Sequence, residues 1–119
     1  MAEGRPASSK RGLRVECHEI DGTLLVECHG KLIFENTSAL KEAVRDRIPG
    51  HKRVIIDFKN VPQIDSSGLG SVVGLYVSAR TRGCELQIAN ASEQIRNLFS
   101  MTNLLSLFEQ AGRHHGKTI

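Results

Sequence analysis

Two adjacent hydroxyl side chains, Ser66 and Ser67, are the residues of this sequence whose setting best suits chemistry. They follow Asp65 in the stretch Ile64-Asp-Ser-Ser-Gly-Leu-Gly70, where a polar loop gives way to apolar residues at helical spacing. We expect a helix to begin at Ser67, with Ser66 as its N-cap. The first turn of a helix offers free backbone N–H groups and the positive end of the helix dipole, which together favour a bound phosphoryl group. Phosphorylation of a serine is therefore the chemistry that this junction suits.

The helix expected after this junction carries a face of small residues. That face holds Ser67, Gly70, Ser71, Gly74 and Ser78. Each glycine inside a helix costs up to ~1 kcal/mol relative to alanine, so two on one face imply that some other backbone approaches closely. Two interpretations stay open: the face packs on the sheet or a neighbouring helix, or it is an exposed docking surface. A separate apolar stripe, expected to face the core, consists of Leu69, Val72, Val73 and Tyr76.

Catalytic and metal sites find little support in the sequence. A hydrolase triad of Asp65, Ser67 and a histidine near the C-terminus lacks the Gly-x-Ser-x-Gly elbow of such enzymes. The pairs Cys17-His18 and Cys28-His29 suggest zinc ligands, but adjacent residues of a strand point to opposite faces. We therefore expect a protein that is not an enzyme and that uses neither a metal nor a cofactor.

The elements that must position the serines follow from periodicity. Leu13–Ile20 and Thr23–His29 are β-patterned runs on either side of Asp21-Gly22, which predicts a hairpin. Strands at Val54–Phe58 and Cys84–Ala89 flank the helix of the serine junction, and this unit is expected to be a right-handed crossover between parallel strands. The expected fold is α/β: a mixed sheet of the N-terminal hairpin and the parallel β-α-β unit, flanked by about four helices. Besides the helix at the junction, these are expected from Asn36 or Thr37 to Pro49-Gly50, from Ser92, and over Leu104–Glu109.

Length and charge restrict the class of protein. A chain of 119 residues fits one domain, expected at residues 13–109 between flexible tails at 1–12 and 110–119. The net charge of +3 lies entirely in residues 1–14, because residues 15–119 sum to zero. A folded nucleic-acid-binding face is therefore not expected. No apolar run reaches the length of a membrane span, no signal peptide is visible, and the three cysteines do not form a disulfide framework, so we expect a cytoplasmic protein.

The order of these motifs resembles the STAS domain, and most closely the bacterial anti-sigma factor antagonists. The resemblance is carried by Val54-Ile-Ile-Asp-Phe58, Ile64-Asp-Ser-Ser-Gly-Leu-Gly70 and the later Ile95-Arg-Asn-Leu-Phe99 with Leu104 and Phe108. It covers roughly Leu13 to Glu109, and the Asp-Ser-Ser-Gly-Leu-Gly stretch is its most specific part.

The resemblance implies a phosphorylation switch that regulates transcription. The unphosphorylated domain, expected to be a monomer when free, would bind a serine-kinase anti-sigma factor and so release a sigma factor. The kinase would use ATP to phosphorylate Ser67, which ends the binding, and a phosphatase would reset it. Partner contacts are expected from Asp65, Ser66, Ser67, Gly68, Gly70, Ser71 and Gly74.

One residue departs from the pattern of the family. Where the family often has Gly-x-Leu-Asp after its second strand, this sequence has Gly30-Lys31-Leu32-Ile33. An apolar residue thus replaces an aspartate near the switch serine, and Glu35 is close enough in sequence to substitute for it. The alternative function is a STAS scaffold or small-molecule-binding subunit that is not phosphorylated.

Overall fold

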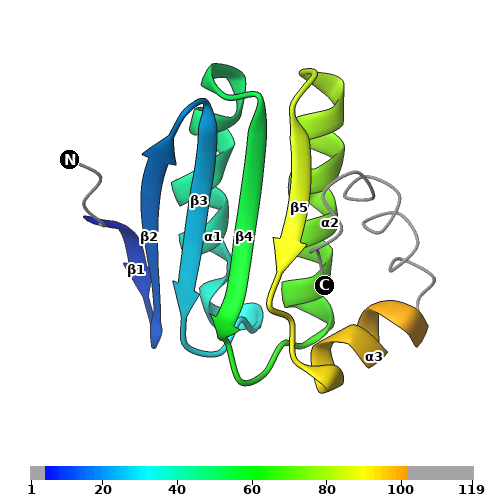
Figure 1. Cartoon of the computed structure of the whole chain (residues 1–119). Coiled ribbons are helices and arrows are strands. Elements are labelled where there is room, and N and C mark those ends of the chain that lie inside the picture. The colour runs from blue at the N-terminus through cyan, green and yellow to red at the C-terminus, as the bar shows by residue number, and fades with distance from the viewer. Residues whose placement is uncertain (1–4, 102–119) are drawn as a thin grey trace.

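A computed structural model describes residues 5–101 as a five-stranded mixed sheet with helices (Figure 1). The strands are β1 (Arg5–Lys10), β2 (Leu13–Ile20), β3 (Thr23–His29), β4 (Arg53–Asn60) and β5 (Glu85–Ala89). The α-helices are α1 (Thr37–Val44), α2 (Ser66–Thr81) and α3 (Glu93–Met101), and 3₁₀ turns span Phe34–Asn36 and Arg45–Gly50. The expected helix at Leu104–Glu109 lies outside the described residues. No described helix is long and apolar enough to cross a membrane.

The sheet order β1-β2-β3-β4-β5 confirms the predicted α/β topology. β2 and β3 form the antiparallel hairpin, and Asp21 (φ 49°) and Gly22 (φ 81°) form its two-residue turn. Such positive φ angles match the right-handed twist of the two strands, and aspartate and glycine tolerate them. β3, β4 and β5 then pair in parallel. The carboxyl ends of β3 and β4 consequently lead into the two loops that precede α1 and α2.

β1 was not expected, because residues 1–12 were predicted to be a flexible tail. Instead, Arg5–Lys10 pairs antiparallel with β2, and Arg11 (φ 43°) and Gly12 (φ 88°) turn the chain between them. The polar composition of this segment gives no apolar alternation that would indicate a strand, and its pairing with β2 is made by backbone groups. β1 also contacts α1, so the ordered domain begins before Leu13.

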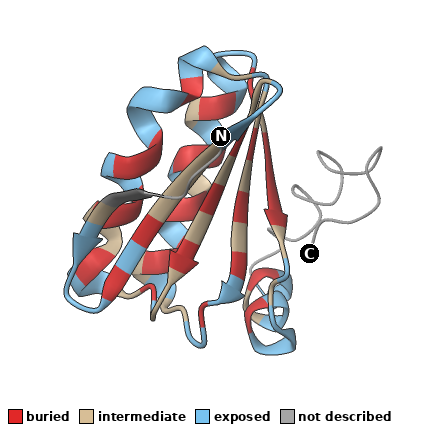
Figure 2. Ribbon diagram, turned by 60° about the vertical axis from the view of Figure 1, so that its left-hand side comes forward, coloured by how far each residue is buried: buried red, intermediate tan, exposed pale blue. Residues whose placement is uncertain are grey.

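The core lies between the sheet and the helices α1 and α2, which both cover one face of it (Figures 1 and 2). Along the strands, buried residues alternate with more exposed ones, as expected for a sheet with one covered face (Figure 2). Val26, Ile56 and Ile88 are fully buried at neighbouring register positions of β3, β4 and β5. The strand that leads into α2, β4, is therefore anchored in the core.

Candidate functional site

The N-terminus of α2 is capped by Asp65 and not, as predicted, by Ser66. One carboxylate oxygen of Asp65 accepts a hydrogen bond from Gly68 N–H at 2.8 Å, and the other accepts one from Phe34 N–H at 2.9 Å. A carboxylate is the stronger acceptor, and its charge is favourable at the positive end of the helix dipole. The bond from Gly68 holds the pKa of Asp65 below its ordinary value, and the bond from Phe34 acts in the same direction.

Asp65 thereby joins the two loops that lead into α1 and α2. Backbone bonds reinforce this joint: Leu32 N–H donates to Gln63 O at 3.0 Å, and Asp65 N–H donates to Leu32 O at 3.2 Å. Gly68 is buried against the joint, because a Cβ atom at this position would lie 2.4 Å from Leu32 O. A close backbone approach therefore occurs at Gly68, and the prediction that Gly70 and Gly74 mark such an approach is wrong within the described residues.

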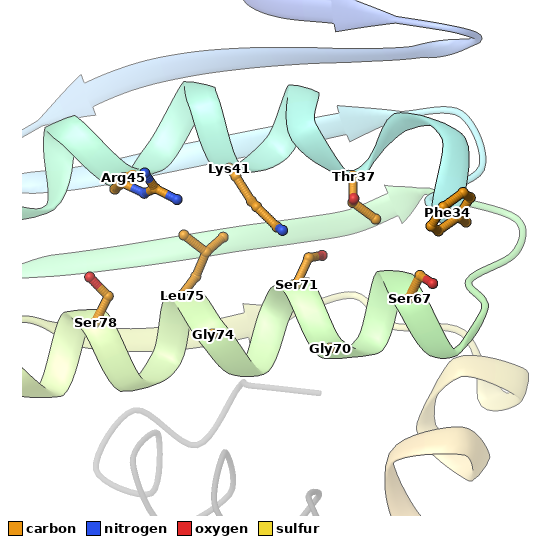
Figure 3. A pocket seen from close by; sticks show the side chains of 10 residues that line it. All are labelled: Phe34, Thr37, Lys41, Arg45, Ser67, Gly70, Ser71, Gly74, Leu75 and Ser78. Carbon is orange, nitrogen blue, oxygen red and sulfur yellow. The ribbon is translucent and has the colours of Figure 1, made fainter.

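Ser66 and Ser67 differ in their surroundings. Ser66 is exposed, whereas Ser67 is half-buried at one end of a groove between α1 and α2 (Figure 3). The groove has a volume of about 520 Å³. Its lining residues are Phe34, Thr37, Lys41, Arg45, Ser67, Gly70, Ser71, Gly74, Leu75 and Ser78. All five residues of the predicted small face are thus brought together along one wall of a groove.

The glycines of this wall face open space. A Cβ atom at Gly70 or Gly74 would have no described atom within 4 Å, so neither glycine is required by packing within residues 5–101. Ser71, in contrast, is buried and donates its hydroxyl hydrogen bond to Gly68 O at 2.7 Å. The small face is therefore open at Gly70 and Gly74, whereas its buried member Ser71 is hydrogen-bonded within the helix.

The opposite wall of the groove comes from α1 and the turn before it, and sequence reasoning missed it. Thr37, Lys41 and Arg45 recur every four residues and point into the groove with Phe34 at its end (Figure 3). The spacing of these residues is visible in the sequence, but periodicity alone does not show that a second helix faces them. Among the described residues neither cation makes an ion pair, and Phe34 is 76% exposed. This wall thus offers two positive charges and an exposed aromatic ring.

Ile33, which stands in place of the aspartate of the family, is half-buried beside the groove and does not line it. Its N–H donates to the side chain of Asn36 at 3.0 Å, and Asn36 in turn donates to the carbonyls of Arg11 and Lys31. Asn36 therefore fixes the loop and does not cap α1 with its side chain. Glu35 is exposed and also lies outside the groove lining. Within residues 5–101, no carboxylate lines the groove.

The fold and the groove define the class: a small α/β domain whose serine-bearing helix N-terminus opens onto a cleft between two helices. The chain belongs to the STAS domain family, whose model matches residues 14–117. It is 30% identical over 96 residues to an anti-sigma-B factor antagonist of Staphylococcus aureus, covering 80% of this chain and 89% of that protein. It is 26% identical over 99 residues to an anti-sigma F factor antagonist of Paenibacillus polymyxa, covering 80% and 83%.

Among solved structures, the phosphorylated form of the Bacillus cell fate determinant SpoIIAA has the same fold. The TM-score is 0.66 at 18% sequence identity, with 79% of this chain and 86% of the other covered. At this identity the likeness concerns the fold alone. It agrees with the mixed sheet and helices described above.

Proposed function

We propose that this protein is an anti-sigma factor antagonist that is switched by phosphorylation of Ser67. The observation that carries the proposal is the position of Ser67, half-buried at the N-terminus of α2 and at the end of the open groove. The names of the relatives support the class of partner, an anti-sigma factor, and the phosphorylated form of SpoIIAA supports the type of switch. Such a protein would act in the cytoplasm, as a binding protein and not as an enzyme.

In the switching step, a serine-kinase partner would transfer the γ-phosphoryl group of ATP to Ser67 Oγ. The O–P bond to Ser67 forms, the bond to ADP breaks, and the hydroxyl proton passes to a base of the kinase. A phosphatase would later hydrolyse the phosphoserine. The positive end of α2 tolerates the added charge, so the phosphorylated domain should stay folded.

Binding by the partner would be lost because of charge. The phosphate adds about −1.5 to −2 charges at neutral pH, and in a docked complex it would be desolvated close to the carboxylate of Asp65. A hundredfold loss of affinity corresponds to ~2.7 kcal/mol. A buried and poorly paired charge costs ~2–5 kcal/mol at an interface, which is enough to produce that hundredfold loss of affinity.

The docking surface would combine the open part of the small face with the wall of α1. Partner contacts would fall on Ser66, Ser67, Gly70 and Gly74, and the exposed ring of Phe34 would be the apolar anchor. Exposed aromatic side chains near the centre of an interface often carry much of its binding energy. Asp65, Gly68 and Ser71 would contribute mainly by fixing the shape of this surface, because their polar groups or backbone are engaged within the domain.

The test is phosphopeptide mapping after incubation with the partner kinase and ATP, together with titration of each variant against that kinase. Ser67→Ala should bind and resist phosphorylation, whereas Ser67→Asp should fold normally and bind weakly. Ser66→Ala is the matched control and should remain a substrate, because Ser66 does not supply the cap. Phosphate found on Ser66, or undiminished binding by the phosphorylated protein, would contradict the proposal.

A further inference from the structure

The sheet face turned away from α1 and α2 carries a cluster of histidine and glutamate side chains on the β2–β3 hairpin. Glu16 and Glu27 are directly opposite each other in the register, and His18 and His29 lie two residues further along their respective strands. Alternation along a strand places all four on the same face. The earlier prediction was correct that Cys17 and Cys28 are on the other face, but it did not consider the glutamates that accompany the histidines.

Three of these side chains converge. One donor atom each of Glu16, His18 and Glu27 lies within 4.8 Å of the other two, and His18 Nε2 is 3.3 Å from Glu27 Oε1. Zinc bound tetrahedrally by imidazole nitrogen and carboxylate oxygen, with bonds of ~2.0–2.2 Å, has donor atoms roughly 3.4 Å apart. Small rotations of the half-buried glutamate side chains would close the remaining distance.

The cluster also carries more negative than positive charge, and its side chains are partly buried. The side chains of Glu16 and Glu27 are only 20% and 32% exposed, and Asp57 of β4 is in register next to Glu27. Like charges directly opposite each other on a sheet are destabilising. Among the side chains that the structure describes, Arg14 is the only permanent cation in the ion pairs of this cluster, with its Nε 2.8 Å from Glu16 Oε2. A divalent cation bound between Glu16 and Glu27 would neutralise this excess negative charge.

His29 supplies an independent indication. Its Nε2 is shielded from solvent and has no hydrogen-bond partner among the described residues, although Glu16 Oε1 and Glu27 Oε1 lie 3.9 and 3.8 Å away. Its Nδ1 is 3.3 Å from the side-chain nitrogen of Asn60, which can only donate, so Nδ1 accepts and Nε2 carries the proton. The Nε2–H of His29 lies near both carboxylates but is hydrogen-bonded to neither. A small movement of either glutamate would form such a bond, and outer hydrogen bonds of this kind orient the carboxylate ligands of metal ions.

We propose that Glu16, His18 and Glu27 bind a Zn²⁺ ion on the open face of the sheet, with water at the fourth position. Arg14 and His29 orient the two carboxylates. A mixed set of imidazole and carboxylate ligands suits zinc better than magnesium or calcium, which prefer oxygen alone. The site is separate from Ser67 and its groove, so it does not depend on the proposed function.

The test is calorimetric titration of the reduced, untagged full chain with ZnCl₂, and absorption spectroscopy with Co²⁺ as a probe. One ion should bind per chain, and the Co²⁺ spectrum should lack a thiolate charge-transfer band. Glu27→Gln and His18→Asn should abolish this binding while circular dichroism shows the native fold. His29→Asn should weaken it about 10–100-fold, as other outer-shell substitutions do.

Two controls separate this site from other metal-binding groups. His51→Asn removes a histidine that pairs with Glu19 outside the cluster, and it should leave the affinity unchanged. Substitution of both His114 and His115 by Asn should also leave it unchanged. The proposal is overturned if no ion binds at millimolar Zn²⁺, if a thiolate band appears, or if binding survives Glu27→Gln and His18→Asn. Ser67→Ala should bind zinc normally, so failure of one proposal leaves the other intact.

Discussion

Replacing Asp65 with alanine should destabilise the domain measurably, because one carboxylate holds two loops together. The substitution removes the N-cap bond from Gly68 N–H and the bond from Phe34 N–H. Loss of an N-cap costs about 1 kcal/mol, and loss of an ordinary hydrogen bond costs a further 0.5–1.5 kcal/mol or so. We expect the free energy of unfolding at pH 7 to fall by about 1.5–2.5 kcal/mol. For a domain of this size, that lowers the melting temperature by roughly 6–12 °C.

The effect should depend on pH in one direction. The pKa of Asp65 is lower in the folded protein than its ordinary value, so the folded state favours the carboxylate. Its charge therefore contributes stability that is complete above the unfolded pKa and is lost as the pH falls through the folded pKa. The difference between the wild-type protein and Asp65→Ala should be constant above about pH 5 and should shrink on acidification.

Urea unfolding followed by far-ultraviolet circular dichroism is the appropriate assay, because the chain has no tryptophan. Glu42→Ala is the control, since it removes an exposed carboxylate from α1 that makes no ion pair among the described residues. Asp65→Asn should be intermediate, because one amide oxygen replaces two carboxylate oxygens. A loss below about 0.5 kcal/mol for Asp65→Ala, smaller than any ordinary N-cap, would refute the reasoning, as would a difference that does not change with pH.

Three further predictions concern the glycines of α2, the strand β1 and the thiol of Cys28. Gly68→Ala should strongly lower the free energy of unfolding, because the added Cβ would lie 2.4 Å from Leu32 O. Gly70→Ala and Gly74→Ala should each raise the free energy of unfolding by up to ~1 kcal/mol, because their Cβ atoms would enter open space. Equal effects at the three positions in thermal or urea unfolding would contradict the assignment of open space. Deletion of residues 1–10 should reduce the free energy of unfolding by about 2 kcal/mol or more, because β1 pairs with β2; an unchanged value would show that β1 contributes nothing. Cys28 should resist iodoacetamide at pH 8 in the native protein, because burial raises the pKa of its thiol to about 12, and mass spectrometry of the alkylated chain would reveal any modification.

The hairpin, the parallel unit and the small face of α2 could all be predicted, because each is encoded locally. Asp21-Gly22 specifies its turn by backbone preference alone, and periodicity places Gly70 and Gly74 on one side of a helix with Ser67. These signals depend only on residues close together in the sequence. They therefore predict local structure without knowledge of the contacts made by distant parts of the chain.

The features that sequence reasoning missed depend on residues far apart in the chain. Asp65, and not Ser66 as predicted, is the N-cap of α2, because its carboxylate also accepts a hydrogen bond from Phe34 N–H, 31 positions away in the chain. β1 forms because β2 offers a free edge, and its polar residues carry no signal of that partner. The pairing of Glu16 with Glu27 follows from the hairpin register, but the convergence of His18 on them depends on side-chain orientation. The sequence by itself therefore determined the family, most of the elements and the serine, Ser67, that we propose as the switch. Only the tertiary structure decided the opposite wall of the groove, with Lys41 and Arg45, because two helices must pack side by side before a cleft exists between them.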